Sequence, residues 1–201
     1  MNFLRELSIA EIVSRLAAAL LYAAIQGLLL AGLARLMGDR KPQYEGRLTL
    51  NPFAHVAAWG MLMAALFAMS WIRPMRFDPR ANRFGGLGIV FIVVFGLAGM
   101  LLLVPVLDLL RPFVLYLPRT GSYAVLIVFE ALQKIIVGSV ILNLLPVPGL
   151  IAGSLLWALW PAQDRRLRRW EPIALALVGG SVVAGLLPNL SASVLPYLKL
   201  V

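Results

Sequence analysis

The stretch RLAAALLYAAIQGLLLAGLARLMG, Arg15–Gly38, decides the class of fold, because it has no charged side chain between Arg15 and Arg35. An apolar run of about 18 residues or more is long enough to cross a lipid bilayer as a helix. This run is too long for the apolar region of a cleavable signal peptide, and no A-x-A-like cleavage site follows it. We therefore expect residues 16–34 to form a membrane-spanning helix that stays in the mature protein.

Further apolar segments follow along the chain, at 53–72, 84–107, 120–142, 147–161 and 172–198. The first, second and last of these contain no Lys, Arg, Asp or Glu and are long enough to span. Segment 120–142 is also long enough but contains Glu130 and Lys134, and segment 147–161 is short, so it either crosses or forms a re-entrant hairpin. The sequence predicts an all-α polytopic membrane protein of about six transmembrane or re-entrant helices, in a single domain over 1–201.

The composition agrees with a membrane protein and narrows the classes of partner. Hydrophobic residues make up 61% of the chain and charged residues only 13%, against roughly 25% charged in soluble domains. The net charge of +9 comes largely from arginines in short loops beside apolar segments, where they face lipid headgroups. We therefore predict the lipid bilayer, and not nucleic acid, as a partner. With no cysteine in the chain, disulfides and thiolate chemistry are excluded.

The distribution of basic residues leaves the orientation in the membrane open. With six crossings, the alternate loops beginning after the first segment hold more Lys and Arg than the opposite side, which favours an N-terminus outside the cytoplasm. If 147–161 does not cross, the four arginines of RRLRR, Arg165–Arg169, change sides and the preference reverses.

Three stretches between the apolar segments have an unusual composition: GRLTLNPFAHVAAWG (Gly46–Gly60), WIRPMRFDPR (Trp71–Arg80) and NLLPVPGLIAG (Asn143–Gly153). Together they resemble the site-2 protease family of intramembrane zinc metalloproteases, in its small bacterial form without a PDZ domain. The resemblance is carried by Gly46, Arg47, Leu48, Thr49, Leu50, Asn51, Pro52, His55, Asn143, Leu144, Pro146 and Pro148. It implies a site-2-protease-like helical core and a place in the bacterial inner (cytoplasmic) membrane.

The zinc-binding residues of that family are replaced in this chain. Its H-E-x-x-H motif would fall on Gln26–Leu30, so Gln26 and Leu30 stand for the two histidines and Gly27 for the glutamate base. Ile151 stands where the family has its aspartate ligand. Independently of any alignment, such a centre needs two histidines four residues apart, a third ligand and a carboxylate base, and this chain has one histidine. We therefore predict no catalytic residue, no cofactor and no bound zinc.

The single histidine, His55, admits other interpretations. The loop acids Asp39, Glu45 and Asp78 have no ligand spacing that would complete a metal site with it. A serine hydrolase would need one of Ser139, Ser154 and Ser181, none of which lies in a G-x-S-G pattern. We interpret His55 as structural, with one ring nitrogen hydrogen-bonded to a backbone carbonyl near the turn set by Asn51 and Pro52.

Two features suggest contacts with other proteins. Glu130 and Lys134 are four residues apart in an apolar run, so they share a helix face and can pair within the membrane. The pair either neutralises itself inside the bundle, meets a partner subunit, or lines a polar path. Gly149 and Gly153 have the four-residue spacing that allows close helix packing.

These observations predict a catalytically inactive site-2-protease-like membrane protein. We expect it to act as an accessory or structural subunit of a membrane complex, or as a binder of transmembrane segments beside the NLLPVPG stretch. Two alternatives stay open: an active intramembrane peptidase with an unconventional centre, and a small transporter component.

Overall fold

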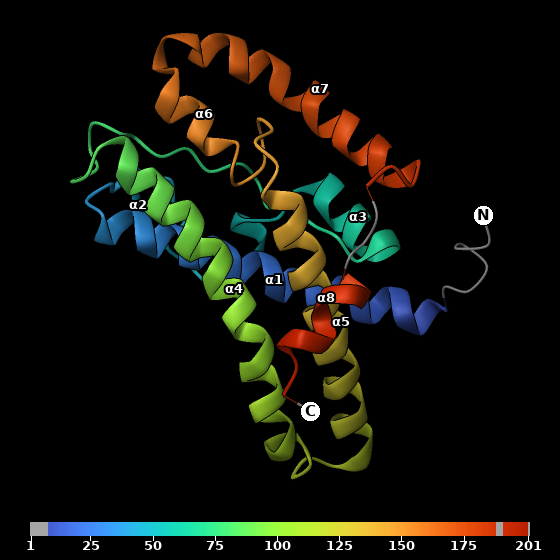
Figure 1. The fold of residues 1–201 in the computed structure, drawn as a ribbon. Coiled ribbons are helices and arrows are strands. Elements are labelled where there is room, and N and C mark those ends of the chain that lie inside the picture. Colours follow the sequence, from blue (N-terminus) through green and yellow to red (C-terminus); the bar gives the residue numbers. More distant parts are fainter. Residues whose placement is uncertain (1–7, 188–190, 201) are drawn as a thin grey trace.

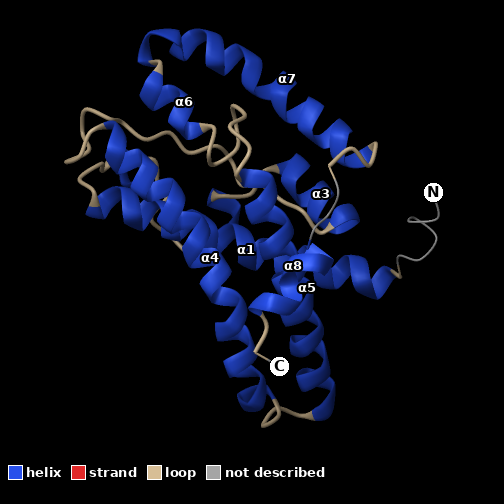
Figure 2. Ribbon diagram, viewed as in Figure 1, coloured by secondary structure: helices blue, strands red, loops and turns tan. Residues whose placement is uncertain are grey.

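The computed structural model describes residues 8–187 and 191–200, which are all-helical apart from their connecting loops (Figures 1 and 2). The elements are α1 (Ile9–Leu36), α2 (Lys41–Tyr44), η1 (Pro52–Ala54), α3 (Ala58–Phe67), α4 (Gly86–Val114), α5 (Arg119–Asn143), α6 (Ser154–Leu159), η2 (Pro161–Gln163), α7 (Asp164–Val183) and α8 (Ser191–Leu198). Among these described residues no β-strand occurs, and an isolated antiparallel bridge joins Val56 to Ile72. The prediction of an all-α protein is confirmed.

In the described part of the chain, three helices are long and apolar enough to cross a membrane, namely α1, α4 and α5. They correspond to the predicted segments 16–34, 84–107 and 120–142. The last of these contains the charged residues Glu130 and Lys134. These three helices therefore support the prediction of a membrane protein. They pack on one another, and α4 and α5 form a hairpin whose tip extends away from the other helices (Figure 1). Fully buried side chains at their contacts include Tyr22, Leu30, Ile92, Met100 and Ile135.

The expected span 53–72 has a different structure. Its helix, α3, has ten residues, which is about 15 Å of helix, while the hydrocarbon core is roughly 30 Å thick. The helix ends at Phe67, and the residue that caps it, Ala68, has a left-handed φ of +52°. The chain then returns so that the Arg73 N–H donates to the His55 carbonyl at 2.7 Å. The Arg15 guanidinium binds the carbonyls of Ala65 and Leu66 at the end of the helix. Backbone groups satisfied in this way allow an apolar run to fold back on itself.

The last two expected segments also differ from single spanning helices. Segment 147–161 is mostly loop, with only the six-residue α6, because Gly149 turns the chain with a φ of +99°. This structure favours the re-entrant alternative. Segment 172–198 is divided between α7, which begins earlier at Asp164, and α8, and its residues 188–190 lie outside the described residues. Apolar composition alone did not distinguish a spanning helix from a shorter helix packed on others.

Candidate functional site

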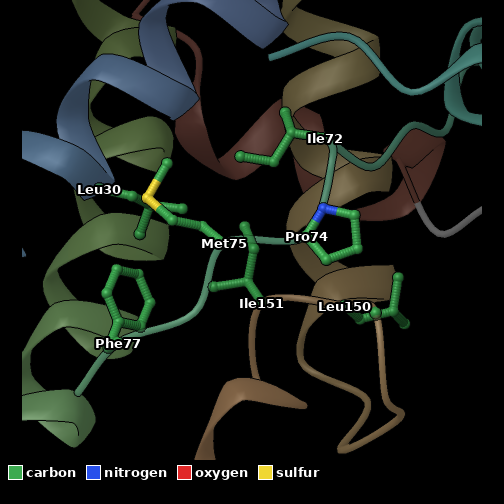
Figure 3. A pocket seen from close by; sticks show the side chains of 8 residues that line it. Leu30, Ile72, Pro74, Met75, Phe77, Leu150 and Ile151 are labelled. Carbon is green, nitrogen blue, oxygen red and sulfur yellow. The ribbon is translucent and has the colours of Figure 1, made fainter. Parts of the chain in front are cut away.

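Leu30 of α1 and Ile151 of the loop before α6 lie at the same small cavity. Their side chains converge with those of Met75 and Phe77 from the loop before α4 (Figure 3). The complete lining is Leu30, Ile72, Pro74, Met75, Phe77, Gly149, Leu150 and Ile151. The cavity has a volume of about 10 Å³, roughly the space for one water molecule, yet a buried water needs two or more polar partners. Two positions that the resemblance assigns to zinc ligands are thus brought together, and all the side chains around them are apolar.

Gln26, at the position that the resemblance assigns to the first histidine, is turned toward α4. Its side-chain amide donates to the Gly96 carbonyl at 3.3 Å, and the side chain is fully buried. The amide oxygen Oε1 has no hydrogen-bond partner among the residues that the structure describes. Gln26 therefore joins α1 to α4 and does not line the cavity at Leu30.

His55 packs directly on Gly27, the position that the resemblance assigns to the glutamate base. A Cβ on Gly27 would lie 2.1 Å from the His55 Nδ1 atom, so the imidazole fills the space that any side chain at 27 would need. The His55 Nε2 atom is 2.9 Å from the Thr49 carbonyl oxygen. The hydrogen bond expected for a structural histidine is therefore present, and η1, which begins at Pro52 after the Asn51 cap, sets the turn beside it.

The environment of His55 favours the neutral imidazole. Burial lowers the pKa of His55 below its usual value, and the charge of Arg47 lowers it further, while the hydrogen bond to the Thr49 carbonyl opposes this shift. A neutral ring donating from Nε2 to Thr49 leaves Nδ1 as an acceptor, and Nδ1 finds no partner within the described residues. His55 is thus a buried, neutral packing group at this position.

The lowered pKa of His55 predicts a pH-dependent stability. Because the unfolded chain binds this proton more readily, the stabilisation is complete above about pH 6.5 and is lost as pH falls toward the folded-state pKa. We expect the Tm in detergent to fall by several degrees between pH 7.5 and pH 5. His55→Gln, which cannot titrate, should show a smaller decrease measured by intrinsic tryptophan fluorescence. An equal decrease in both proteins would contradict this assignment.

Among the residues that carry the resemblance, Asn143 makes the most hydrogen bonds. It lies fully buried at the end of α5, and its amide nitrogen donates to the Ser139 carbonyl at 2.8 Å and the Ser70 carbonyl at 3.1 Å, with the Tyr22 hydroxyl at 3.4 Å. Its amide oxygen accepts the Ile151 N–H at 3.2 Å. Asn143 therefore fixes the NLLPVPG loop against α1 and the chain after α3, which places Ile151 at the cavity.

The other residues of the three stretches divide between surface and interior. Arg47 is buried, and its Nη1 atom has no hydrogen-bond partner among the residues described. Leu50, Leu144 and Pro146 are exposed, whereas Gly46 is exposed in a left-handed turn with a φ of +72°. The residues of intermediate exposure are Leu48, Thr49, Pro52 and Pro148.

Gly149 and Gly153 are both buried within the chain. A Cβ on Gly153 would lie 1.9 Å from the Val147 carbonyl oxygen, and one on Gly149 would lie 2.7 Å from the Leu175 side chain. The four-residue spacing of the two glycines therefore corresponds to close packing inside this loop and against α7. Because both glycines are buried, neither is exposed for contact with a partner protein, which the sequence had suggested from their spacing.

Glu130 and Lys134 form the expected ion pair on α5, at 2.9 Å between Oε1 and Nζ. Their side chains are 52% and 46% exposed, so the pair faces outward and is not enclosed in the bundle. Lys199 and Arg111 are close enough to act electrostatically on Glu130. The Glu130–Lys134 pair therefore lies on the outer side of α5, near its middle.

A buried polar network between α4 and α5 was not anticipated from the sequence. The Asp108 carboxylate, fully buried, accepts from Gln133 Nε2 at 2.7 Å and pairs with Arg111 Nε at 3.0 Å. Its second oxygen accepts the Leu200 N–H at 2.9 Å, which fixes the chain after α8. Hydrogen bonds of this kind hold helices together in lipid. In the sequence, this network was indicated only by Asp108, just after the apolar run 84–107, and by Gln133, within the apolar run 120–142.

The serines and loop acids considered above have other hydrogen bonds. Ser154 and Ser181 donate to the carbonyls of Ile151 and Leu177 in their own turns, and the Ser139 hydroxyl accepts the Ser70 N–H. Asp39 is fully buried and accepts the backbone N–H groups of Lys41 and Asp78. Across residues 8–187 and 191–200, no group of three or more His, Cys, Asp or Glu side chains is placed to hold a metal ion.

Comparison of the chain with protein-family models, with curated proteins and with solved structures gives no significant match.

Proposed function

We propose that this chain is a catalytically inactive, site-2-protease-like protein of the bacterial inner membrane, with about six transmembrane or re-entrant segments. It binds membrane segments of other proteins, as an accessory subunit of a complex. The observation that carries the proposal is the cavity shared by Leu30 and Ile151. A zinc site at these positions would need nitrogen or oxygen ligands, and the chain presents aliphatic side chains there.

The packing of His55 on Gly27 supports the same proposal. A general base at position 27 would need both a carboxylate and the space to reach a bound water. The imidazole ring occupies that space, and its Nε2 atom is held by the Thr49 carbonyl. His55 and Asn143, two of the residues that carry the resemblance, are therefore buried where they hold the core together, which fits retention of a fold after loss of its chemistry.

The Glu130–Lys134 pair supports a protein partner on the outer face of α5. A charged side chain near the centre of a bilayer costs about 2.5–3.5 kcal/mol on insertion scales, and the pair is half-exposed in the middle of a helix long enough to span. Mutual pairing lowers that cost but leaves polar groups facing lipid. A partner helix with complementary polar groups on this face would remove them from the hydrocarbon.

The test is to purify the chain from its own membrane in mild detergent and to identify the proteins that remain bound. We expect a particle larger than the 22.0 kDa chain with a partner in fixed stoichiometry. The exchange Glu130→Lys with Lys134→Glu keeps the ion pair but reverses its polarity. Partner recovery should fall about tenfold or more, a loss of roughly 1.4 kcal/mol, while the purified chain stays folded.

The control is the same exchange at Asp164 and Arg168, an exposed pair with the same four-residue spacing on α7. It should leave partner recovery intact. A chain that purifies alone would refute the proposed function, and undiminished recovery with the exchanged Glu130 and Lys134 would refute the α5 face as the contact.

A further inference from the structure

One face of α7 packs on the molecule and the opposite face is uncovered. Val178 and Val182 belong to a cluster of buried apolar side chains with Trp71, and Glu171 pairs with Arg76 at 3.2 Å. The helix lies along the outer edge of the fold (Figure 1). Its outward face is therefore exposed at the surface of the protein.

That outward face changes from basic to apolar along the helix. Arg165, Arg166 and Arg169 are exposed in the first two turns, whereas Ile173, Leu177 and Val183 are exposed in the last three, at 47%, 67% and 57%. From Ile173 to Val183 the helix rises about 15 Å, half the thickness of a hydrocarbon core of roughly 30 Å. The apolar part thus matches the depth of one lipid leaflet.

The boundary between the two parts has the chemistry of a lipid headgroup site. Trp170 is half-exposed there, as tryptophans at membrane interfaces are, and it lines a shallow hollow with Arg165, Arg166 and Arg169. Arg168 is paired with Asp164, but the other three guanidinium groups have no ion pair or hydrogen bond to any described residue. Guanidinium groups bind phosphate oxygens in bidentate fashion.

We propose that this hollow binds the phosphate of an anionic phospholipid. Its headgroup lies between Arg165, Arg166 and Arg169, and its acyl chains run along the apolar outward face from Ile173. Charge complementarity selects an anionic over a zwitterionic lipid, because each basic residue near a charged membrane surface contributes about fivefold to the attraction. This site does not depend on the proposed loss of protease function or on the α5 face.

The test uses the full chain, delipidated in detergent and mixed with equal amounts of phosphatidylglycerol and phosphatidylcholine of matched acyl chains. Native mass spectrometry counts the bound lipids. We expect phosphatidylglycerol to be retained over phosphatidylcholine, and this preference to fall about tenfold or more in the variant Arg165→Gln, Arg166→Gln, Arg169→Gln. The matched control is Arg40→Gln, Arg80→Gln, Arg119→Gln, which removes the same charge from exposed positions and should keep the preference.

Two results would overturn the proposal. One is an equal loss in both triple variants, which would mean that overall charge and not this hollow selects the lipid. The other is displacement of phosphatidylglycerol by millimolar inorganic phosphate, which would identify a site for soluble phosphate. Retention of phosphatidylglycerol in excess phosphate, lost only in the α7 variant, supports the lipid site.

Discussion

Gly27→Ala is expected to destabilise the protein strongly, because it adds a methyl group where the ring of His55 lies. The new Cβ would lie 2.1 Å from Nδ1 and 2.2 Å from Cγ of His55, and the fully buried ring is held by Thr49, so it has little freedom to move away. Overpacking of a core costs about 1–3 kcal/mol or more. For a chain of this size we expect the Tm in detergent to fall by about 5–10 °C.

The matched control is Gly32→Ala on the same helix, where a Cβ would meet nothing within 4 Å. It should leave the Tm unchanged or raise it, because alanine favours a helix over glycine. Adding His55→Ala to Gly27→Ala should recover part of the lost stability by removing the ring. A Gly27→Ala protein as stable as the wild type would show that His55 does not pack on Gly27.

Asn143→Ala is expected to have the second large effect. It removes the donor to the Ser70 carbonyl and the acceptor of the Ile151 N–H, and each buried polar group left without a partner costs about 1–3 kcal/mol. We expect a loss of about 3–5 kcal/mol. Because Asn143 fixes the loop that carries Ile151, amide hydrogen exchange between residues 145 and 153 should increase before global unfolding.

The control is Ser181→Ala, whose hydroxyl donates to the Leu177 carbonyl of its own helix. That carbonyl keeps its helical environment, so the change should cost no more than about 0.5 kcal/mol. If Asn143→Ala leaves loop exchange at the wild-type rate, Asn143 does not fix the loop.

The part of the fold that could be predicted from sequence is the part that depends on local composition. The long, largely apolar runs at 16–34, 84–107 and 120–142 correspond to long helices. Such a run is recognised from its length and composition, and as a helix it satisfies its backbone hydrogen bonds within the segment, so no contact with another segment is needed to predict it. The run 53–72 was equally apolar but forms the short α3, since its ends are held by Arg15 and by the His55 carbonyl. The Arg15 contact comes from a distant part of the chain, and neither contact has a local sequence pattern that predicts it.

The candidate site shows the same division. The composition established that one histidine and no cysteine are available, and the hydrogen bond of His55 to a nearby carbonyl was expected. The sequence did not predict that the Glu130–Lys134 pair faces outward, nor that Asp108 is hydrogen-bonded to Gln133. Helical spacing shows which residues share a face of the helix, but it does not show whether that face contacts another helix or the surroundings.

The sequence by itself determined that this chain has the composition of a membrane protein and where its three long apolar helices lie. It also determined that the chain has one histidine and no H-E-x-x-H motif. Only the tertiary structure decided that Leu30 and Ile151 meet at one cavity and that the imidazole of His55 lies on Gly27. The physical reason is that composition and periodicity act within a few turns of helix. Contacts between distant segments depend on how whole helices pack, and that is settled by the fit of many side chains together.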